Sequence, residues 1–219
     1  MIELRGQTLS YGPAVVLENV TLTIRQGERV ALLGRSGAGK STLLAAIREK
    51  AMVAGKEVAL VPQDNALVPQ LSLFHNVHMG RLHRHSALYN LVTLLRPFRR
   101  DRAEVAELTR ELGLEPPVDQ PVERLSGGQR QRTAVARAIH GGGEVLLADE
   151  PVSALDEKQA PEVLATLISR FPTSVISLHD VGLAQAYCTR LVGLKDRRII
   201  FDMPAGEQNA ADIDHLYAR

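Results

Sequence analysis

The sequence lacks several features that would assign it to a specialised class of protein. It has a single cysteine, Cys188, so an internal disulfide is impossible and a reducing environment is expected. No apolar stretch approaches the roughly 20 residues that a membrane-spanning helix needs, and the first residues do not resemble a secretory signal. With a net charge of +1, the chain shows no excess typical of nucleic-acid binders or of enzymes acting on acidic substrates. If the protein works at a membrane, another chain must span it.

The remaining composition is that of an ordinary folded domain. Of the 219 residues, 45% are hydrophobic and 23% are charged, which is enough to build one sizeable α/β domain. There are no internal repeats, no low-complexity tract and no linker that would divide the chain. We therefore expect one domain over residues 1–219, in which Cys188 is a small buried hydrophobe.

Hydrophobic patterning predicts alternating strands and helices. Short apolar or alternating runs predict strands over residues 2–10, 15–24, 29–33, 57–61, 145–148, 174–178, 191–194 and 198–201. Helical spacing is found over residues 41–50, 101–112, 157–170 and 181–187. Because residues 71–140 are mostly helical, we expect a core formed by about 1–63 and 144–219 and a helical subdomain at about 64–143.

A phosphate-binding loop is expected at residues 34–41, whose sequence is GRSGAGKS. It matches G-x-x-x-x-G-K-[ST] and lies between a predicted strand and a predicted helix. Glycines let the backbone N–H groups turn inward to phosphate oxygens, Lys40 supplies a mobile charge, and the Ser41 hydroxyl can bind Mg²⁺. The alternative is a glycine-rich turn that matches by chance, which average residue frequencies allow in about 1% of such chains. The flanking strand and helix disfavour it.

Two acids follow the apolar run at residues 145–148. Ligands of open α/β sheets bind at the carboxyl ends of strands, where Asp149 and Glu150 are placed. Asp149 would then hold Mg²⁺, directly or through water, and Glu150 would activate the attacking water as general base. An acidic strand end that caps the turn at residues 151–153 is the alternative, and the phosphate-binding loop makes it less favoured.

Residues 125–132, LSGGQRQR, resemble the signature sequence of ATP-binding-cassette (ABC) ATPases. Ser126, Gly127 and Gly128 would open a helix whose N-terminus attracts an anion. The resemblance implies that this anion is the γ-phosphate held by an opposing subunit, and that Gln129 belongs to the same nucleotide site. The protein would therefore act as a homodimer or pseudo-dimer with ATP at the interface.

The resemblance extends to single residues elsewhere in the chain. Gln63 resembles the glutamine that contacts Mg²⁺ or water and senses the membrane partner, and residues 153–156 resemble the loop that couples the two sites. His179 resembles the switch histidine at the γ-phosphate, and Tyr11 occupies the position of an aromatic ring stacked on adenine. Taken singly, Gln63 and His179 could be ordinary polar residues at strand ends, and Tyr11 could simply pack in a turn.

The family resemblance implies three sets of site residues and a P-loop NTPase fold. Glu150, His179 and Gln63 would be catalytic, and Ser41, Gln63 and Asp149 would hold Mg²⁺. ATP would be bound by Tyr11, Gly34, Arg35, Ser36, Gly37, Ala38, Gly39, Lys40, Ser41, Thr42, Ser126, Gly127, Gly128 and Gln129.

One segment departs from the family pattern. Only 21 positions separate Thr42 from Gln63, which is short for the family. We therefore expect a RecA-like core of parallel strands with an inserted helical subdomain and a reduced N-terminal antiparallel β-lobe.

Three stretches are similar to ATPases of phosphonate importers, namely residues 67–82, 177–188 and 213–217. They imply an importer subunit on the cytoplasmic face of the plasma or inner membrane, driving uptake of phosphonate, phosphite or a related small oxyanion. Transmembrane permease subunits would dock on the region after Gln63, a periplasmic or extracellular binding protein would act indirectly, and no nucleic acid is expected. The alternative is a soluble accessory ATPase of phosphonate catabolism or another cytosolic complex. A non-hydrolysing binder is disfavoured because the hydrolytic residues implied above are all present.

The segment over residues 81–102 is locally basic, with six arginines and a single acid, Asp101. A solvated surface and a face turned toward anionic lipid or an acidic permease loop both remain open. The same region is rich in histidine, but its spacing matches no structural zinc pattern, so we expect no metal site there: His75, His78, His83 and His85.

Overall fold

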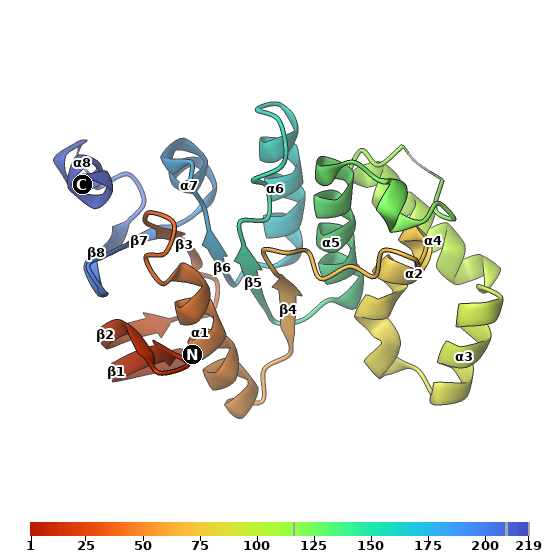
Figure 1. Ribbon diagram of the computed structural model, residues 1–219, viewed down its shortest axis with the longest axis horizontal. Helices are drawn as coiled ribbons and strands as arrows, with labels where there is room; N and C mark the ends of the chain where they lie inside the picture. Colours follow the sequence, from red (N-terminus) through yellow and green to blue (C-terminus); the bar gives the residue numbers. More distant parts are fainter. Residues whose placement is uncertain (116, 209, 219) are drawn as a thin grey trace.

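The computed structural model describes residues 1–115, 117–208 and 210–218 (Figure 1). The strands are β1 (Ile2–Tyr11), β2 (Ala14–Ile24), β3 (Arg29–Leu33), β4 (Val58–Val61), β5 (Val145–Asp149), β6 (Ser174–Ser177), β7 (Arg190–Lys195) and β8 (Arg198–Pro204). The α-helices are α1 (Lys40–Val53), α2 (Leu73–His78), α3 (Ala87–Leu95), α4 (Arg99–Glu111), α5 (Gly127–Gly141), α6 (Gln159–Arg170), α7 (Val181–Tyr187) and α8 (Ala210–Tyr217). Two 3₁₀-helices, η1 (Met79–Arg84) and η2 (Val122–Arg124), complete the set in the described residues. The elements expected from the sequence begin and end within three residues of these bounds, and α8 was not expected.

The centre of the molecule is a six-stranded sheet with the order β4-β5-β6-β3-β7-β8. The first five strands are parallel, and β8 returns antiparallel to β7. Parallel strands are buried on both faces, which explains why they appear in the sequence as short apolar runs without alternation. The carboxyl ends of β3, β5 and β6 therefore lie at one edge of the sheet, where the predicted site residues follow.

Each face of this sheet has its own hydrophobic core. In β3, Val30 and Leu32 point toward α1 and the β1–β2 pair, whereas Ala31 and Leu33 point toward the layer of α5, α6 and α7. The alternation follows from the two-residue repeat of a strand. These four side chains have no exposed surface, so the strand that leads into the phosphate-binding loop is fixed from both sides.

The antiparallel lobe is small, as the short segment after Thr42 predicted. It consists of β1 paired with β2, from Ile2 opposite Ile24 to Tyr11 opposite Ala14. Residues 54–57 alone connect α1 to β4, which leaves no room for another strand pair in between. The expectation of a reduced lobe is confirmed.

The helical segment lies between β4 and β5 and extends to one side of the sheet (Figure 1). Serine side chains start two of its helices: Ser72 caps α2 by accepting from the His75 N–H, and Ser86 caps α3 by accepting from the Tyr89 N–H. The core at this end is continuous with that of the sheet. Since α5 packs against both β4 and α2, it is the element that connects the two parts.

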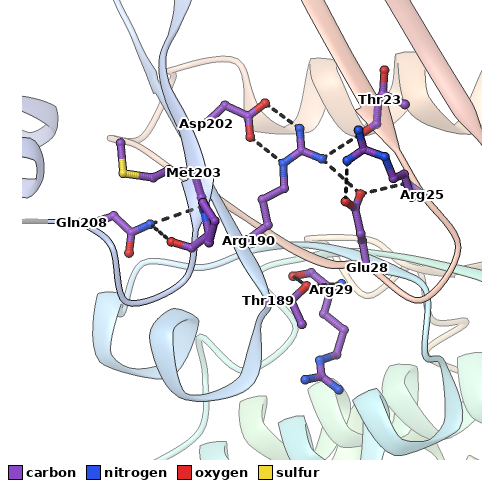
Figure 2. Close-up of polar contacts among 10 residues, drawn as sticks. Thr23, Arg25, Glu28, Arg29, Thr189, Arg190, Asp202, Met203 and Gln208 are labelled. Atoms are coloured by element: carbon purple, nitrogen blue, oxygen red, sulfur yellow. Dashed lines mark hydrogen bonds and ion pairs between the residues drawn. The ribbon is translucent and has the colours of Figure 1, made fainter.

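An ion-pair network ties β2, β7, β8 and the turn before β3 together at the amino end of the parallel sheet (Figure 2). The guanidinium of Arg190 in β7 binds both carboxylate oxygens of Asp202 in β8, at 2.5 and 2.7 Å. It also donates to Glu28, at 3.1 Å, and to the Thr23 carbonyl of β2, at 2.9 Å. The neighbouring acids raise the pKa of Arg190, so this half-buried charge is well compensated.

Cys188 is buried, with 6% of its surface exposed, as expected. Burial raises the pKa of its thiol to about 12, so it behaves as an inert hydrophobe.

Candidate active site

The loop between β3 and α1 folds as a phosphate-binding loop. It requires glycine at position 39, where the backbone has a left-handed φ of 98° and a Cβ would lie 2.9 Å from the Leu17 side chain. At Gly34, φ is 148° and a Cβ would lie 2.5 Å from the Leu194 carbonyl oxygen. The loop is therefore shaped by its neighbours in β2 and β7 as well as by its own sequence. It presents residues 35–38 at the N-terminus of α1, where Ser41 and Thr42 occupy the first turn.

Lys40 begins α1 and is 5% exposed. Its ammonium group donates to the carbonyl oxygens of Gly34, at 2.9 Å, and Arg35, at 3.3 Å, and lies 3.9 Å from a carboxylate oxygen of Glu150. Burial lowers the pKa of Lys40, while the charges of Glu150 and Asp149 act in the opposite direction. The loop therefore folds around the ammonium group of Lys40. A phosphate bound there could accept the hydrogen bonds that Lys40 now donates to the two loop carbonyls.

Asp149 and Glu150 follow β5, and Ser177 at the end of β6 holds both. The Ser177 hydroxyl donates to the Asp149 carboxylate and accepts from the Glu150 N–H at 2.9 Å. Glu150 has a φ of 52°, a left-handed conformation that is unfavourable for a residue with a side chain and needs such support. The sequence interpretation missed Ser177 because a serine at the end of an apolar strand carries no signal of its own.

His179 completes the group of charged side chains. Its Nε2 lies 2.5 Å from Glu150 Oε1, and the same carboxylate oxygen is the one near Lys40. Glu150 is thus placed between a histidine and a lysine, with Asp149 and Ser177 next to it. These residues come from three neighbouring strands, and the structure brings together the predicted residues Lys40, Asp149, Glu150 and His179.

The signature residues open α5. The Ser126 hydroxyl accepts from the Gln129 N–H, at 3.2 Å, and the Gln129 side chain accepts from the Ser126 N–H, at 2.8 Å, which forms a capping box. Around Gly127 the space is open, whereas a Cβ on Gly128 would lie 3.1 Å from the Ala154 carbonyl oxygen. The helix therefore presents its N-terminal end at an exposed surface close to residues 153–156.

Gln131 links this helix to the acidic strand end, and the sequence interpretation also missed it. Its side-chain amide donates to the Glu150 carbonyl oxygen and accepts from the Ala154 N–H, both at 2.7 Å. Gln131 is 3% exposed. It lies within the signature segment, two residues beyond Gln129, and this position was the only sign in the sequence that it belongs near the site.

The signature end of α5 does not lie next to the chain's own phosphate-binding loop. That loop follows β3, while α5 packs on β4, and β5 and β6 lie between these two strands (Figure 1). Three interstrand steps correspond to about 14 Å. The strand that leads to Lys40 and the strand on which α5 packs are thus three positions apart in the sheet, whereas Glu150 is bonded to α5 through Gln131.

Gln63 and Tyr11 are exposed at two other edges of this region. Gln63 begins the turn that follows β4, and Tyr11 lies at the tip of the β1–β2 hairpin with 80% of its surface exposed. The Tyr11 ring is thus open to solvent and does not pack in the turn.

The arginines and histidines of the helical segment form local contacts. Arg81 pairs with Glu104, Arg84 with Glu57, and Arg102 with Asp119, so half of the basic stretch is compensated within the chain. Within the described ranges, His, Cys, Asp and Glu side chains form no cluster of three or more that could hold a metal ion.

Comparison with known proteins assigns the sequence to a family. The family described as "ABC transporter" matches residues 17–153. The chain belongs to the ABC transporter family. It is an ATP-binding cassette, the ATPase component of that family, and both the expected fold and the expected class of enzyme are confirmed.

Two relatives named "Phosphonates import ATP-binding protein PhnC" match nearly the whole cassette. The protein of Anaeromyxobacter dehalogenans is 38% identical over 240 residues, covering 99% of this chain and 48% of its own length. The chain therefore spans about half of that relative. The protein of Natronomonas pharaonis is 37% identical over 233 residues, covering 99% of each chain.

A solved structure of a bacterial ABC transporter cassette, MJ0796, is dimeric. It superposes with a TM-score of 0.79 at 26% identity and covers 95% of this chain and 100% of its own. A second structure of that cassette is a post-hydrolysis state bound to ADP and phosphate. This cassette shares their fold.

Proposed function

We propose that this cassette drives the import of phosphonate, phosphite or a related small oxyanion through a membrane permease. The names of the relatives support the substrate class, and their agreement over 99% of the chain favours an importer over a soluble accessory ATPase. Within the described ranges, no helix combines the length and apolar character that crossing a bilayer requires. In this proposal a permease provides the passage across the membrane, and the cassette works on its cytoplasmic face.

The observation that carries the hydrolytic function is the convergence of Lys40, Glu150 and His179 on one point beside Asp149. Glu150 acts as general base toward the attacking water, because its carboxylate is held by His179 and its backbone by Ser177. Lys40 exchanges its carbonyl partners for the β- and γ-phosphates of ATP. Tyr11 stacks on the adenine from the hairpin of the reduced lobe.

The oxygen donors at this site suit Mg²⁺, a hard cation that prefers carboxylate, hydroxyl and amide oxygens. Ser41 in the first turn of α1, Asp149 at the end of β5, and Gln63 after β4 would hold it. Bound there, Mg²⁺ would neutralise charge that develops on the phosphate oxygens.

The nucleotide is sandwiched between two copies of the cassette in head-to-tail arrangement. The strand order supports this, because α5 packs on β4, three strands away from β3 and its phosphate-binding loop, and the signature is then free to reach a second copy. The dimeric structure of MJ0796 is consistent with it. Residues 153–156, which lie against Gly128, would relay changes between the two sites.

The permease docks on the helical subdomain at about residues 64–143. In α3, Leu88, Leu91 and Leu95 share one face at helical spacing and are 72%, 56% and 80% exposed. A pocket beside this face is lined by Leu71, His75, Met79, Leu82 and Leu94. An apolar helix face of this kind marks an interaction site, and the permease is the partner that an importer cassette requires.

The test uses Glu150→Gln with Glu157→Gln, an exposed acid seven residues later, as the matched control. We expect Glu150→Gln to keep ATP binding, to form a stable ATP-bound dimer by gel filtration, and to lose turnover by at least about 100-fold. Retained turnover would exclude Glu150 as the base. Isolation of the tagged Glu150→Gln cassette from membranes tests the partner: a polytopic permease supports import, and cytosolic enzymes alone would contradict it.

A further inference from the structure

The turn that follows Gln63 has an unusual backbone. Asn65 and Ala66 both adopt left-handed conformations, with φ of 60° and 44°. Asparagine tolerates this region, but alanine is disfavoured there because its Cβ approaches the backbone. Within the turn, the Asn65 N–H donates to the Pro62 carbonyl at 3.0 Å and the Ala66 N–H donates to the Asp64 carboxylate at 3.1 Å. Two consecutive left-handed residues need a further contact to fix them.

Arg137 of α5 supplies that contact. One guanidinium nitrogen donates to the Ala66 carbonyl and another to the Asn65 carbonyl, both at 2.6 Å. A single planar group thus binds the carbonyls of both left-handed residues, across 71 and 72 positions of sequence. Hydrogen bonds from a charged donor are roughly twice as strong as neutral ones. Burial lowers the pKa of Arg137, and the charge of Asp64 partly compensates it.

The position of Arg137 joins the turn to the signature. It lies eleven residues after Ser126 in the same helix, which is about three turns and places it on the same side. That helix is packed tightly behind it, because a Cβ on Gly80 would lie 2.4 Å from the Arg137 carbonyl oxygen. Any reorientation of α5 therefore moves the guanidinium and the turn that it holds.

We propose that Arg137 is a positioning residue for Gln63. Arg137 fixes the turn after β4 and thereby couples the placement of Gln63 to the orientation of the signature helix. Arg137 itself touches neither nucleotide nor metal. The inference rests on the proposed role of Gln63 at Mg²⁺. Its consequence is that loss of the double contact alters the metal dependence of hydrolysis, which a purely structural arginine would not change.

The decisive variant is Arg137→Lys, which keeps the charge and can bind one carbonyl but not both. We measure the Mg²⁺ concentration that gives half-maximal ATP turnover, together with the urea midpoint, on the purified full chain. We expect the half-maximal Mg²⁺ concentration to rise at least fivefold in Arg137→Lys. The matched control is Arg81→Lys, which weakens a different guanidinium-to-carbonyl contact on α5, with His140, and is expected to leave the Mg²⁺ dependence unchanged.

Two double variants separate positioning from a loss of folding. Ala66→Gly removes the penalty of the left-handed conformation, so in the Arg137→Lys background it should restore at least half of the lost metal affinity. In the Gln63→Ala background, Arg137→Lys should have no further effect on Mg²⁺ dependence.

Three results would overturn the proposal, and they point to different errors. An Arg137→Lys effect that persists at full size in Gln63→Ala would show that Arg137 acts independently of Gln63. Unchanged Mg²⁺ dependence in Arg137→Lys, with an altered one in Gln63→Ala, would refute the positioning role and leave the proposed site intact. An unaltered dependence in Gln63→Ala would refute the role of Gln63 at the metal and the inference with it.

Discussion

Ser177→Ala is the sharpest test of how Asp149 and Glu150 are held. Ser177 has no exposed surface, and its hydroxyl both donates to Asp149 and accepts from the Glu150 N–H. Ser174 begins the same strand, is equally buried, and its hydroxyl has no hydrogen-bond partner. Ser174→Ala is therefore a control with the same chemical change, the same strand and the same burial.

The expected magnitude follows from the two lost contacts. A hydrogen bond to a carboxylate contributes about 1.5–3 kcal/mol, and a buried N–H left unsatisfied costs about 1–3 kcal/mol. We expect Ser177→Ala to lower the free energy of unfolding by about 3 kcal/mol. Without its anchor, Glu150 is free to leave its left-handed conformation, which lies about 1–2 kcal/mol above the right-handed one. Since about 1.4 kcal/mol corresponds to a tenfold change in rate, kcat should fall roughly tenfold.

The assay combines urea unfolding with steady-state ATP turnover for the two variants. Ser174→Ala should keep wild-type turnover and should not lower the free energy of unfolding, because it removes a buried hydroxyl that has no partner. If Ser177→Ala kept wild-type kcat at saturating ATP, Ser177 would not be needed to hold Glu150. Equal destabilisation by both variants would show that the effect comes from the lost volume and not from the hydrogen bonds.

Two further predictions concern the dimer and the pH dependence of stability. A mixture of Ser126→Arg and Lys40→Ala cassettes should hydrolyse ATP faster than either alone, because a mixed dimer regains one intact site; no gain would contradict the sandwich. Burial lowers the pKa of His140 to about 4, so the unfolded chain binds more protons between about pH 6.5 and 4 and stability is lost as the pH falls through this range. At pH 4.5 the loss should be about 2–3 kcal/mol in urea unfolding, and His140→Leu should flatten this slope; an unchanged slope would show that other groups dominate.

The sequence predicted the parallel core well, because buried strands and amphipathic helices leave strong patterns. The runs at residues 29–33 and 145–148 became β3 and β5, and α7 has the predicted bounds. The reduced lobe was also predictable, because the short distance between Thr42 and Gln63 can be counted directly in the sequence. The helix α8 was missed because it is short and is placed by packing: Leu216 is fully buried, and Lys195 binds the His215 carbonyl.

The candidate site was predictable in its charged residues but not in its supports. Lys40, Asp149, Glu150 and His179 belong to spaced motifs, and the structure brings them together. Ser177 and Arg137 act through partners 27 and 71 positions away, and which partners those are depends on strand order and helix packing. Contacts of this kind form only when the fold is complete, so no local pattern in the sequence predicts them.

The strand order has a consequence for the protein during its synthesis on the ribosome. β3 emerges early, but its neighbours β6 and β7 are encoded far downstream; the N–H of Gly27, just before β3, bonds Thr173 across 146 positions. At 5–20 residues per second, the apolar segment at residues 30–33 waits roughly 7–30 s for its partners. During that time it is an unpaired hydrophobic strand, open to chaperones and to aggregation. The nucleotide loop joined to it therefore has no binding-competent shape until nearly the whole cassette has been translated.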